Sequence, residues 1–315
     1  FLTKTHIMKT SKINTIKKSL ALFGTTLLIV TFLASCGDTD GEISSQGEAN
    51  IKVTDAAVDA ENVNGVYLSV KEVQATANGN SRTIATFDSP KLFNIMAYQN
   101  GEVYVLGSGD LKAGSYSDIR LIMSAEADSY VEMADQTTKE LVIENATTTG
   151  YKISGAFTVA ANQTTDLVAD IDLRKAIVTN SEGAFMLRSN ARLVEERVTG
   201  KITGTVSGTT EDRLVVYAYK KGTFDASEEN APAENETRYQ NSVNSAVVAE
   251  NGTYTLAFME EGEYEFVVAS YSNMDDDEDL EFEGSLESSV SVSGNVLDFV
   301  NIESNTNLVA NIIIQ

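Results

Sequence analysis

Short segments in which apolar and polar residues alternate are the feature that most limits how this chain can fold. The longest runs from Gly65 to Val73, and Ala49 to Thr54 shows the same period of two. This alternation buries one face of a β-strand and leaves the other in solvent. Turn-forming pairs such as Asn100-Gly101 separate the runs, whereas helical periodicity is weak and confined to Ser89–Ala97 and Leu173–Val178. We therefore predict an all-β protein built from β-sandwiches.

The only cysteine of the chain, Cys36, follows an uncharged and mostly apolar run from Leu20 to Ser35. The tetrad Leu33-Ala34-Ser35-Cys36 resembles the lipobox of bacterial lipoproteins, which implies acylation of the cysteine, for example with palmitate, and cleavage in front of it. As a helix the run would rise about 24 Å, less than the ~30 Å hydrocarbon core of a bilayer. We therefore predict a lipid anchor at Cys36; a short transmembrane anchor is the alternative.

Four segments follow from this assignment. Residues 1–35 are predicted to form a signal peptide that starts at Met8, with residues 1–7 as upstream read-through. Residues 36–48 are polar, acidic and poor in apolar side chains, which predicts a lipidated, flexible tether. This acidic stretch is similar to the surface-export signals of Bacteroidetes lipoproteins, so we expect a surface-exposed protein of the outer membrane. Residues 49–196 and 197–315 would each form a β-sandwich.

The first of these predicted sandwiches resembles the domain of unknown function 4382 family. The resemblance is carried by Val53-Thr54-Asp55, by Phe93 to Gly101 and by Ala113-Gly114-Ser115-Tyr116-Ser117-Asp118-Ile119-Arg120-Leu121, and it closes with Leu167 to Asp172 and Lys175. The family often has a proline after the basic residue near its end, where Arg188 is followed by Ser189 here. The resemblance implies an extracytoplasmic β-sandwich, frequent on lipoproteins, and brings no established activity.

The second predicted sandwich resembles a carboxypeptidase-regulatory-like, transthyretin-type domain. The similar segments are Val198 to Val206, Asn251 to Leu256 and Glu261 to Val268. Such a domain implies a spacer or an interaction module. Between these segments, Lys220 to Ser245 is long and polar, which predicts a mobile loop.

Charge and residue types exclude several classes of function. The chain has 23 basic and 46 acidic residues; loss of residues 1–35, with five lysines and no acid, would leave 18 against 46 and a net charge of −28. Such a surface repels nucleic acid, which we exclude as a partner. The processed chain would also lack histidine, which excludes Ser-His-Asp and Cys-His catalysis and metal sites built on His or Cys. Calcium binding and acid–base chemistry of Asp and Glu stay open.

Two groups of acids are candidates for that chemistry. The run with Asn273, Asp275, Asp277 and Asp279 could supply oxygens to calcium, although it lacks the glycine of an EF-hand loop; a solvated acidic loop with no metal is the alternative.

Asp170 and Asp172 are two apart on a predicted strand, so both carboxylates would lie on the same face. A close pair of carboxylates suits a general acid, but ion pairs with Arg120 or Lys175 are the simpler interpretation.

Several aromatic residues form the third candidate, because sugars stack on aromatic rings. They are Phe93, Tyr98, Tyr104, Tyr116, Tyr130 and Tyr151. Their alternation with polar residues favours packing in the core over a glycan site.

Together these features predict a non-enzymatic surface lipoprotein that acts as a binding or structural interaction module. It would contact the membrane through the lipid at Cys36 and use no cofactor except weakly bound calcium. A glycan-binding or calcium-assisted adhesive protein is the alternative, followed by a carboxylate-based hydrolase; the partner, glycan or protein, is left open.

Overall fold

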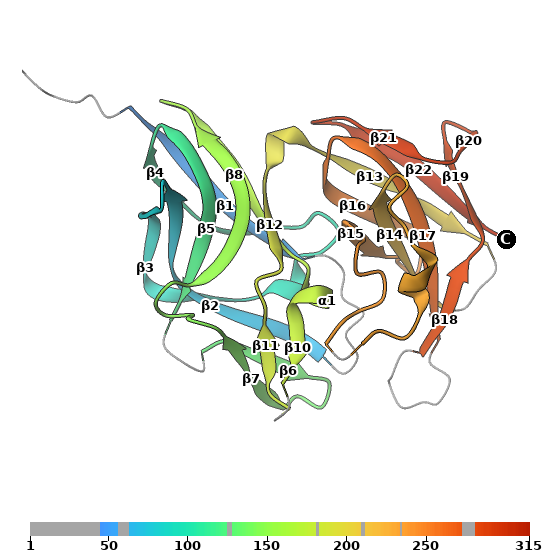
Figure 1. The fold of residues 1–315 in the computed structure, drawn as a ribbon, viewed down its shortest axis with the longest axis horizontal. Helices are drawn as coiled ribbons and strands as arrows, with labels where there is room; N and C mark the ends of the chain where they lie inside the picture. Colours follow the sequence, from blue (N-terminus) through green and yellow to red (C-terminus); the bar gives the residue numbers. More distant parts are fainter. Residues whose placement is uncertain are drawn as a thin grey trace, which may run out of the picture. The chain divides into compact units, whose positions relative to one another are not determined.

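β-Strands make up almost all regular structure of the protein, as a computed structural model shows (Figure 1). The structure describes residues 45–55, 63–124, 128–180, 183–208, 212–233, 235–272 and 281–315, which belong to one compact unit. The predicted all-β sandwich fold is confirmed. None of the helices in these ranges has the length and apolar character needed to span a lipid bilayer.

The first twelve strands form one connected set in the order β10-β11-β7-β6-β2-β5-β8-β12-β9-β1-β4, and β3 pairs with β2. They are β1 (Gln46–Asp55), β2 (Val63–Ala77), β3 (Asn80–Asn94), β4 (Tyr104–Lys112), β5 (Gly114–Met123), β6 (Tyr130–Met133), β7 (Thr138–Ile143), β8 (Tyr151–Val159), β9 (Thr164–Ile171), β10 (Ile177–Thr179), β11 (Phe185–Leu187) and β12 (Ala191–Glu195). The alternating apolar residues of β1 and β2, such as Ile51, Val53 and Leu68, are fully buried in a common core. The period of two therefore marks the buried face as expected.

The remaining ten strands form two five-stranded sheets, β16-β13-β22-β19-β20 and β15-β14-β17-β18 with β21 on β17. They are β13 (Thr199–Ser207), β14 (Arg213–Lys220), β15 (Asn244–Val247), β16 (Thr253–Glu260), β17 (Gly262–Ser272), β18 (Glu281–Leu286), β19 (Ser288–Val292), β20 (Asn295–Leu297), β21 (Val300–Ile302) and β22 (Asn307–Ile314). The two sheets enclose a core that includes Ile202, Val216, Leu256 and Ile312. The β14–β17 sheet has a second apolar cluster around Tyr217, Tyr219 and Tyr271.

The helices are shorter than the sequence predicts. Residues 80–94 form the strand β3, so the predicted helix Ser89–Ala97 is wrong except for the single 3₁₀ turn η1 (Ile95–Ala97). Pairing with β2 extends to Asn94, whose side chain then caps the turn by accepting a hydrogen bond from the Met96 N–H. The other predicted helix ends early, because α1 (Leu173–Ala176) gives way to β10 at Ile177. Two more 3₁₀ turns occur, η2 (Glu196–Val198) and η3 (Ala226–Glu229).

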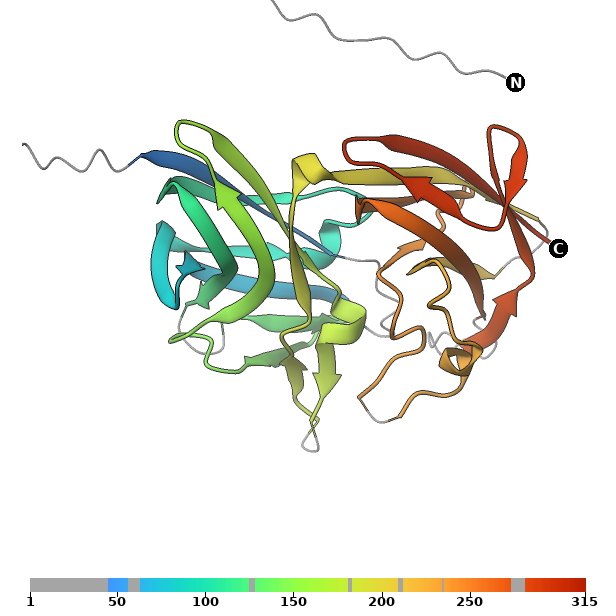
Figure 2. The ribbon, with the colours of Figure 1, turned by 45° about the horizontal axis from the view of Figure 1, so that its top comes forward.

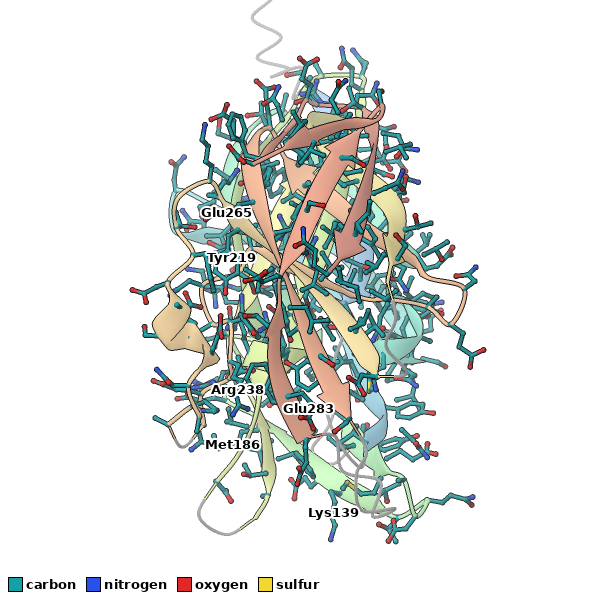
Figure 3. The ribbon with its side chains drawn as sticks, turned by 90° about the vertical axis from the view of Figure 1, so that its right-hand side faces the viewer. Lys139, Met186, Tyr219, Arg238, Glu265 and Glu283 are labelled. Atoms are coloured by element: carbon teal, nitrogen blue, oxygen red, sulfur yellow. The ribbon has the colours of Figure 1, made fainter. Side chains whose placement is uncertain are left out.

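The prediction of a mobile loop between β14 and β15 is wrong for the residues that the structure describes there, 221–233 and 235–243, called the insert below. The carboxylate of Glu265 on β17 accepts hydrogen bonds from three consecutive N–H groups at its start, those of residues 222–224. Near its end, Tyr239 is fully buried and stacks on Tyr217 with 4.2 Å between ring centroids. Figure 3 labels Arg238 of the insert together with Tyr219 of β14 and Glu265 of β17. The ring of Tyr239 thus packs the insert against β14, although the sequence around Tyr239 is polar and does not predict this packing.

Tyr239 provides a test of this packing. Within the described residues its hydroxyl has no hydrogen-bond partner although it is buried. We expect Tyr239→Phe to leave the free energy of unfolding unchanged or to raise it by up to about 1–2 kcal/mol, since an unsatisfied polar group is removed. Tyr239→Ala should lower it by ~3–5 kcal/mol, because the whole ring is lost. Urea unfolding measures both; a marked loss of stability in Tyr239→Phe would contradict the structure.

Candidate functional site: a buried charge cluster beside the insert

The two aspartates singled out in the sequence lie at the end of β9, but each has its own cationic partners. Asp170 is on the strand and pairs with Arg192 of β12 through Oδ2, at 2.6 Å from Nη2 and 2.8 Å from Nε. Asp172 lies just beyond the strand, in front of α1, and contacts Arg174 at 3.2 Å and Lys175 at 3.0 Å. The predicted ion pair with Lys175 is therefore present.

Arg120 does not take part in this cluster. Its Nε lies 3.3 Å from Asp118, on its own strand, and one Nη donates a hydrogen bond to the carbonyl of Thr149. The predicted pairing of Arg120 with Asp170 or Asp172 is wrong. On a strand, residues 118 and 120 share a face, so the nearer carboxylate satisfies the guanidinium.

A third carboxylate, Asp55, joins the cluster and was not singled out in the sequence. β1 pairs in parallel with β9, which sets Thr54 opposite Asp170 and Asp55 opposite Ile171. The buried side chain of Asp55 accepts hydrogen bonds from the Leu173 N–H and from Gln99 Nε2, each at 3.2 Å. Asp55 thus fixes the start of α1, which follows directly after β9. The Val53-Thr54-Asp55 motif was the one available signal in the sequence. A single sequence does not reveal that β1 pairs with β9, which brings Asp55 close to Asp170 and Asp172.

Burial and neighbouring charges move the pKa values of these acids in opposite directions. Burial raises the pKa of Asp55 well above its usual range, the Leu173 N–H opposes this, and the charges of Asp172 and Asp170 add to the rise. Burial likewise raises the pKa of Asp170 against the opposing charge of Arg192. For Asp172 burial acts in the same sense, yet Arg174 and Lys175 outweigh it and the pKa is lowered. Asp172 is therefore the carboxylate held in its charged form.

Arg174 connects the charge cluster to the insert. One Nη donates hydrogen bonds to the carbonyls of Arg238 at 2.8 Å and Tyr239 at 3.3 Å, and the other donates to the hydroxyl of Ser242 at 2.8 Å. Its guanidinium also lies 5.0 Å from the centre of the Tyr217 ring. In Figures 1 and 2, α1 lies beside the segment that contains the insert, in agreement with these contacts.

Two further cations make the same connection. Nζ of Lys175 donates a hydrogen bond to the carbonyl of Ser242 at 2.6 Å. Arg188 donates from one Nη to the carbonyls of Lys175, at 3.0 Å, and Asn235, at 2.9 Å. Arg174, Lys175 and Arg188, which all follow β9, thus bind backbone carbonyls of the insert. The charge cluster therefore connects the first twelve strands with the two sheets formed by β13 to β22.

The space beside Asp55 and Asp170 is too small for a substrate. A cavity of about 10 Å³ lies beside Asp55 and Asp170, bounded on the other side by Asn244 and Ser245. This is about the volume that one water molecule requires, whereas ligand pockets measure ~300–1,000 Å³. A larger open hollow of about 540 Å³ lies between the ends of β13 and β14, but none of the candidate acids lines it. The geometry gives Asp170 and Asp172 a role in holding the fold together.

The other sequence candidates divide into two groups. Cys36 and the calcium candidates Asn273, Asp275, Asp277 and Asp279 lie outside the described residues, so their roles stay predictions. Among the residues that are described, no group of three or more His, Cys, Asp or Glu side chains is arranged to hold a metal ion.

The aromatic candidates do not form one platform. Phe93 stacks on Tyr104 at 4.3 Å between centroids, Tyr116 stacks on Phe157 at 5.1 Å, and Tyr130 stacks on Tyr67 at 4.5 Å. The remaining two are not free platforms either: Tyr98 is half-buried and tilted against Tyr104, and Tyr151 is buried and donates a hydrogen bond to the Arg188 carbonyl. Their ring faces are used in packing, as the core interpretation predicts.

Arg174→Met should show how strongly the cluster stabilises the protein. The substitution leaves Asp172 with one cation and removes three hydrogen bonds to the insert, so we expect a loss of ~3–5 kcal/mol in the free energy of unfolding. Arg197→Met is the matched control, since the Arg197 side chain is 75% exposed and forms a surface ion pair with Glu195; it should cost about 0–1 kcal/mol. Equal effects in chemical unfolding would refute the role of the cluster.

Asp55→Asn should change the pH dependence of stability. A carboxyl whose pKa is higher in the folded than in the unfolded state stabilises the fold below its unfolded pKa, about 3.9, and this contribution is lost as the pH rises through the folded value. Asparagine imitates the protonated form at every pH. We therefore expect the variant to be more stable than the original chain at pH 7 and to show a shallower loss between pH 4 and pH 7. Urea unfolding at pH 4 and pH 7 measures this difference. An equal change in the free energy of unfolding between the two pH values, in the variant and in the original chain, would contradict the raised pKa of Asp55.

Solved structures resemble the chain only distantly. A leucine-rich repeat protein from Bacteroides thetaiotaomicron matches at 11% identity and a TM-score of 0.22, over 86% of this chain and 26% of that one. The major pilin subunit of Bacillus cereus matches at 7% identity and a TM-score of 0.21, over 86% of this chain and 70% of the pilin. A putative carbohydrate binding protein from Pseudomonas aeruginosa matches at 12% identity and a TM-score of 0.19, over 37% of this chain and 90% of that protein. The chain spans about a quarter of the first of these proteins, and likenesses this weak carry no argument about function.

No curated protein matches the chain. Residues 46–189, which contain Asp55, Asp170, Asp172 and Arg174, match the family described as Domain of unknown function (DUF4382). This match supports, for that part of the chain, the relationship to the DUF4382 family that the sequence motifs predict.

Proposed function

We propose that this protein is a non-enzymatic lipoprotein of the cell envelope that acts as a binding or structural interaction module. The observation that supports the proposal is the use of its buried acids: Asp172 pairs with Arg174 and Lys175, and Asp170 pairs with Arg192 beside a cavity of only about 10 Å³. Carboxylates for hydrolysis need a substrate between them. Asp170 instead pairs with Arg192 of β12, and Asp172 pairs with Arg174 and Lys175, the two cations that bind the insert.

The rest of the proposal follows the sequence. The lipid on Cys36 would tether the chain to the outer membrane at the surface of the cell. The spacer would end at residue 45, because residues 46–48, which the sequence places in the flexible tether, pair as the start of β1. The strands from β13 to β22 would form the transthyretin-type spacer or interaction domain. The proposed partner is a protein or a glycan in the cell envelope, and no cofactor is required.

Cys36→Ser tests the anchor on which this proposal depends. The hydroxyl cannot be acylated in place of the thiol, so we expect the variant to lose incorporation of labelled palmitate and to leave the membrane fraction or to accumulate as a precursor. Ser35→Ala is the matched control, because alanine keeps a small residue in front of the cysteine and should keep the protein in the membrane. Undiminished membrane retention of Cys36→Ser after carbonate washing would refute the lipid anchor.

A further inference from the structure

A β-bulge in β16, an edge strand of the β16-β13-β22-β19-β20 sheet, moves Phe258 out of the core. Leu256 is fully buried in that core, so a regular alternation would place residue 258 there as well. The register shifts in between, because two residues of β16, Ala257 and Phe258, lie opposite the single residue Lys201 of β13. Met259 therefore takes the next core position, and Phe258 is half-buried outside the core cluster.

The backbone of Phe258 is strained as well. Its φ is +53°, a left-handed conformation that glycine adopts freely and that bulky side chains avoid. Within the described residues, Phe258 belongs to none of the three apolar clusters. Core packing does not offset this strain, and unexplained strain next to a bulge points to a function for the ring.

Phe258 lines an open hollow of about 330 Å³ at this end of the sheet. The volume lies at the lower end of the range for ligand pockets, ~300–1,000 Å³. The other walls come from the start of β13, from residues 305–307 at the start of β22, and from Gly101 and Glu196 of the preceding strands and turns. The hollow is therefore large enough for one small ring of a ligand, and Phe258 is the aromatic residue in its lining.

The polar groups beside Phe258 are suited to hydroxyl groups. The side-chain amide of Asn305 forms no hydrogen bond within the described part of the chain. The amide of Asn307 uses its oxygen, which accepts a hydrogen bond from the Thr203 hydroxyl at 3.3 Å. Lys201 is exposed and forms no ion pair with any residue that the structure describes. Two amides and an ammonium group thus offer donors to a ligand in the hollow.

The charges around the hollow favour a neutral ligand. Its lining contains the acid Glu196, whose carboxylate is ion-paired with Lys52 at 2.5 Å. Glu260 is exposed and lies close by, opposite Thr199 in the ladder of β13 and β16. Together with the net charge of −23, these acids repel an anion, whereas Lys201 repels a cation.

We propose that the hollow beside Phe258 binds one neutral sugar residue of a glycan. An aromatic ring offers an apolar face to the C–H groups of a pyranose, and the amides and the ammonium group donate to its hydroxyls. The proposal rests on the proposed function, in which the partner is a protein or a glycan, and it assigns the glycan to this site. None of the aromatic candidates from the sequence lines the hollow.

Binding of neutral oligosaccharides to the full chain in detergent tests the site. The probes end in glucose, galactose, mannose or N-acetylglucosamine, and titration calorimetry with the tightest of them gives Kd. Phe258→Gly should weaken binding by at least about tenfold, because the contact with the ring is lost. The melting temperature of this variant should change little, because glycine relieves the positive φ and the ring belongs to no core cluster.

Asn305→Gly and Asn162→Gly form a matched pair. Both asparagines are exposed and have a positive φ, 56° and 59°, which glycine retains without strain. Asn305 lines the hollow, whereas Asn162 lies between β8 and β9. Loss of one amide hydrogen bond should weaken binding by roughly two- to tenfold in Asn305→Gly. Asn162→Gly should bind as the original chain does.

The outcomes separate this site from the proposed function. Failure of every oligosaccharide to bind, equal binding by Phe258→Gly and the original chain, or equal weakening by Asn162→Gly would overturn the sugar site and leave the interaction module as proposed. Binding of an unstructured peptide through Phe258 in place of the sugars would also overturn it. Cleavage of the bound oligosaccharide would support the site but contradict the non-enzymatic function.

Discussion

Together with Lys175 and Arg188, Arg174 connects the end of β9 to the insert. Its side chain is almost fully buried, and one Nη lies 3.2 Å from Asp172 while the guanidinium binds Ser242 and two carbonyls of the insert. A buried cation without such partners would be very costly. The contact of the insert with the end of β9 therefore depends in large part on this guanidinium being satisfied from both sides. It helps to connect the first twelve strands with the sheets formed by β13 to β22.

The charge cluster also separates two uses of acidic residues in one molecule. The charges of Arg174 and Lys175 lower the pKa of Asp172, whereas burial, with a smaller contribution from neighbouring carboxylates, raises the pKa of Asp55. The chain carries 46 acidic residues in all, and its formal net charge is −23. The buried acids of the cluster determine how this part of the chain is assembled.

Local features of the structure were predictable from the sequence, and long-range ones were not. The alternation in residues 49–54 and 65–73 predicts β1 and β2 because burial follows the period of two within each strand. Asp170 and Lys175 are recognisable as candidate residues from their charge and spacing alone. Asp55 did not, because its role arises from a parallel pairing with β9 across more than a hundred residues. The insert also depends on long-range contacts. Its polar composition predicts mobility, but Tyr239 packs it on β14 and the carboxylate of Glu265 on β17 binds its first N–H groups.

The position of β1 has a mechanical consequence. β1 is hydrogen-bonded on both sides, antiparallel to β4 and parallel to β9, and the predicted tether leads directly into its first residue, Gln46. Tension transmitted through the tether would act along the strand, so both ladders would resist it at once in shear rather than opening one bond at a time. An edge strand in the same place would peel away. A chain held at its beginning and stretched by a bound partner would therefore give way in other regions before its first strand.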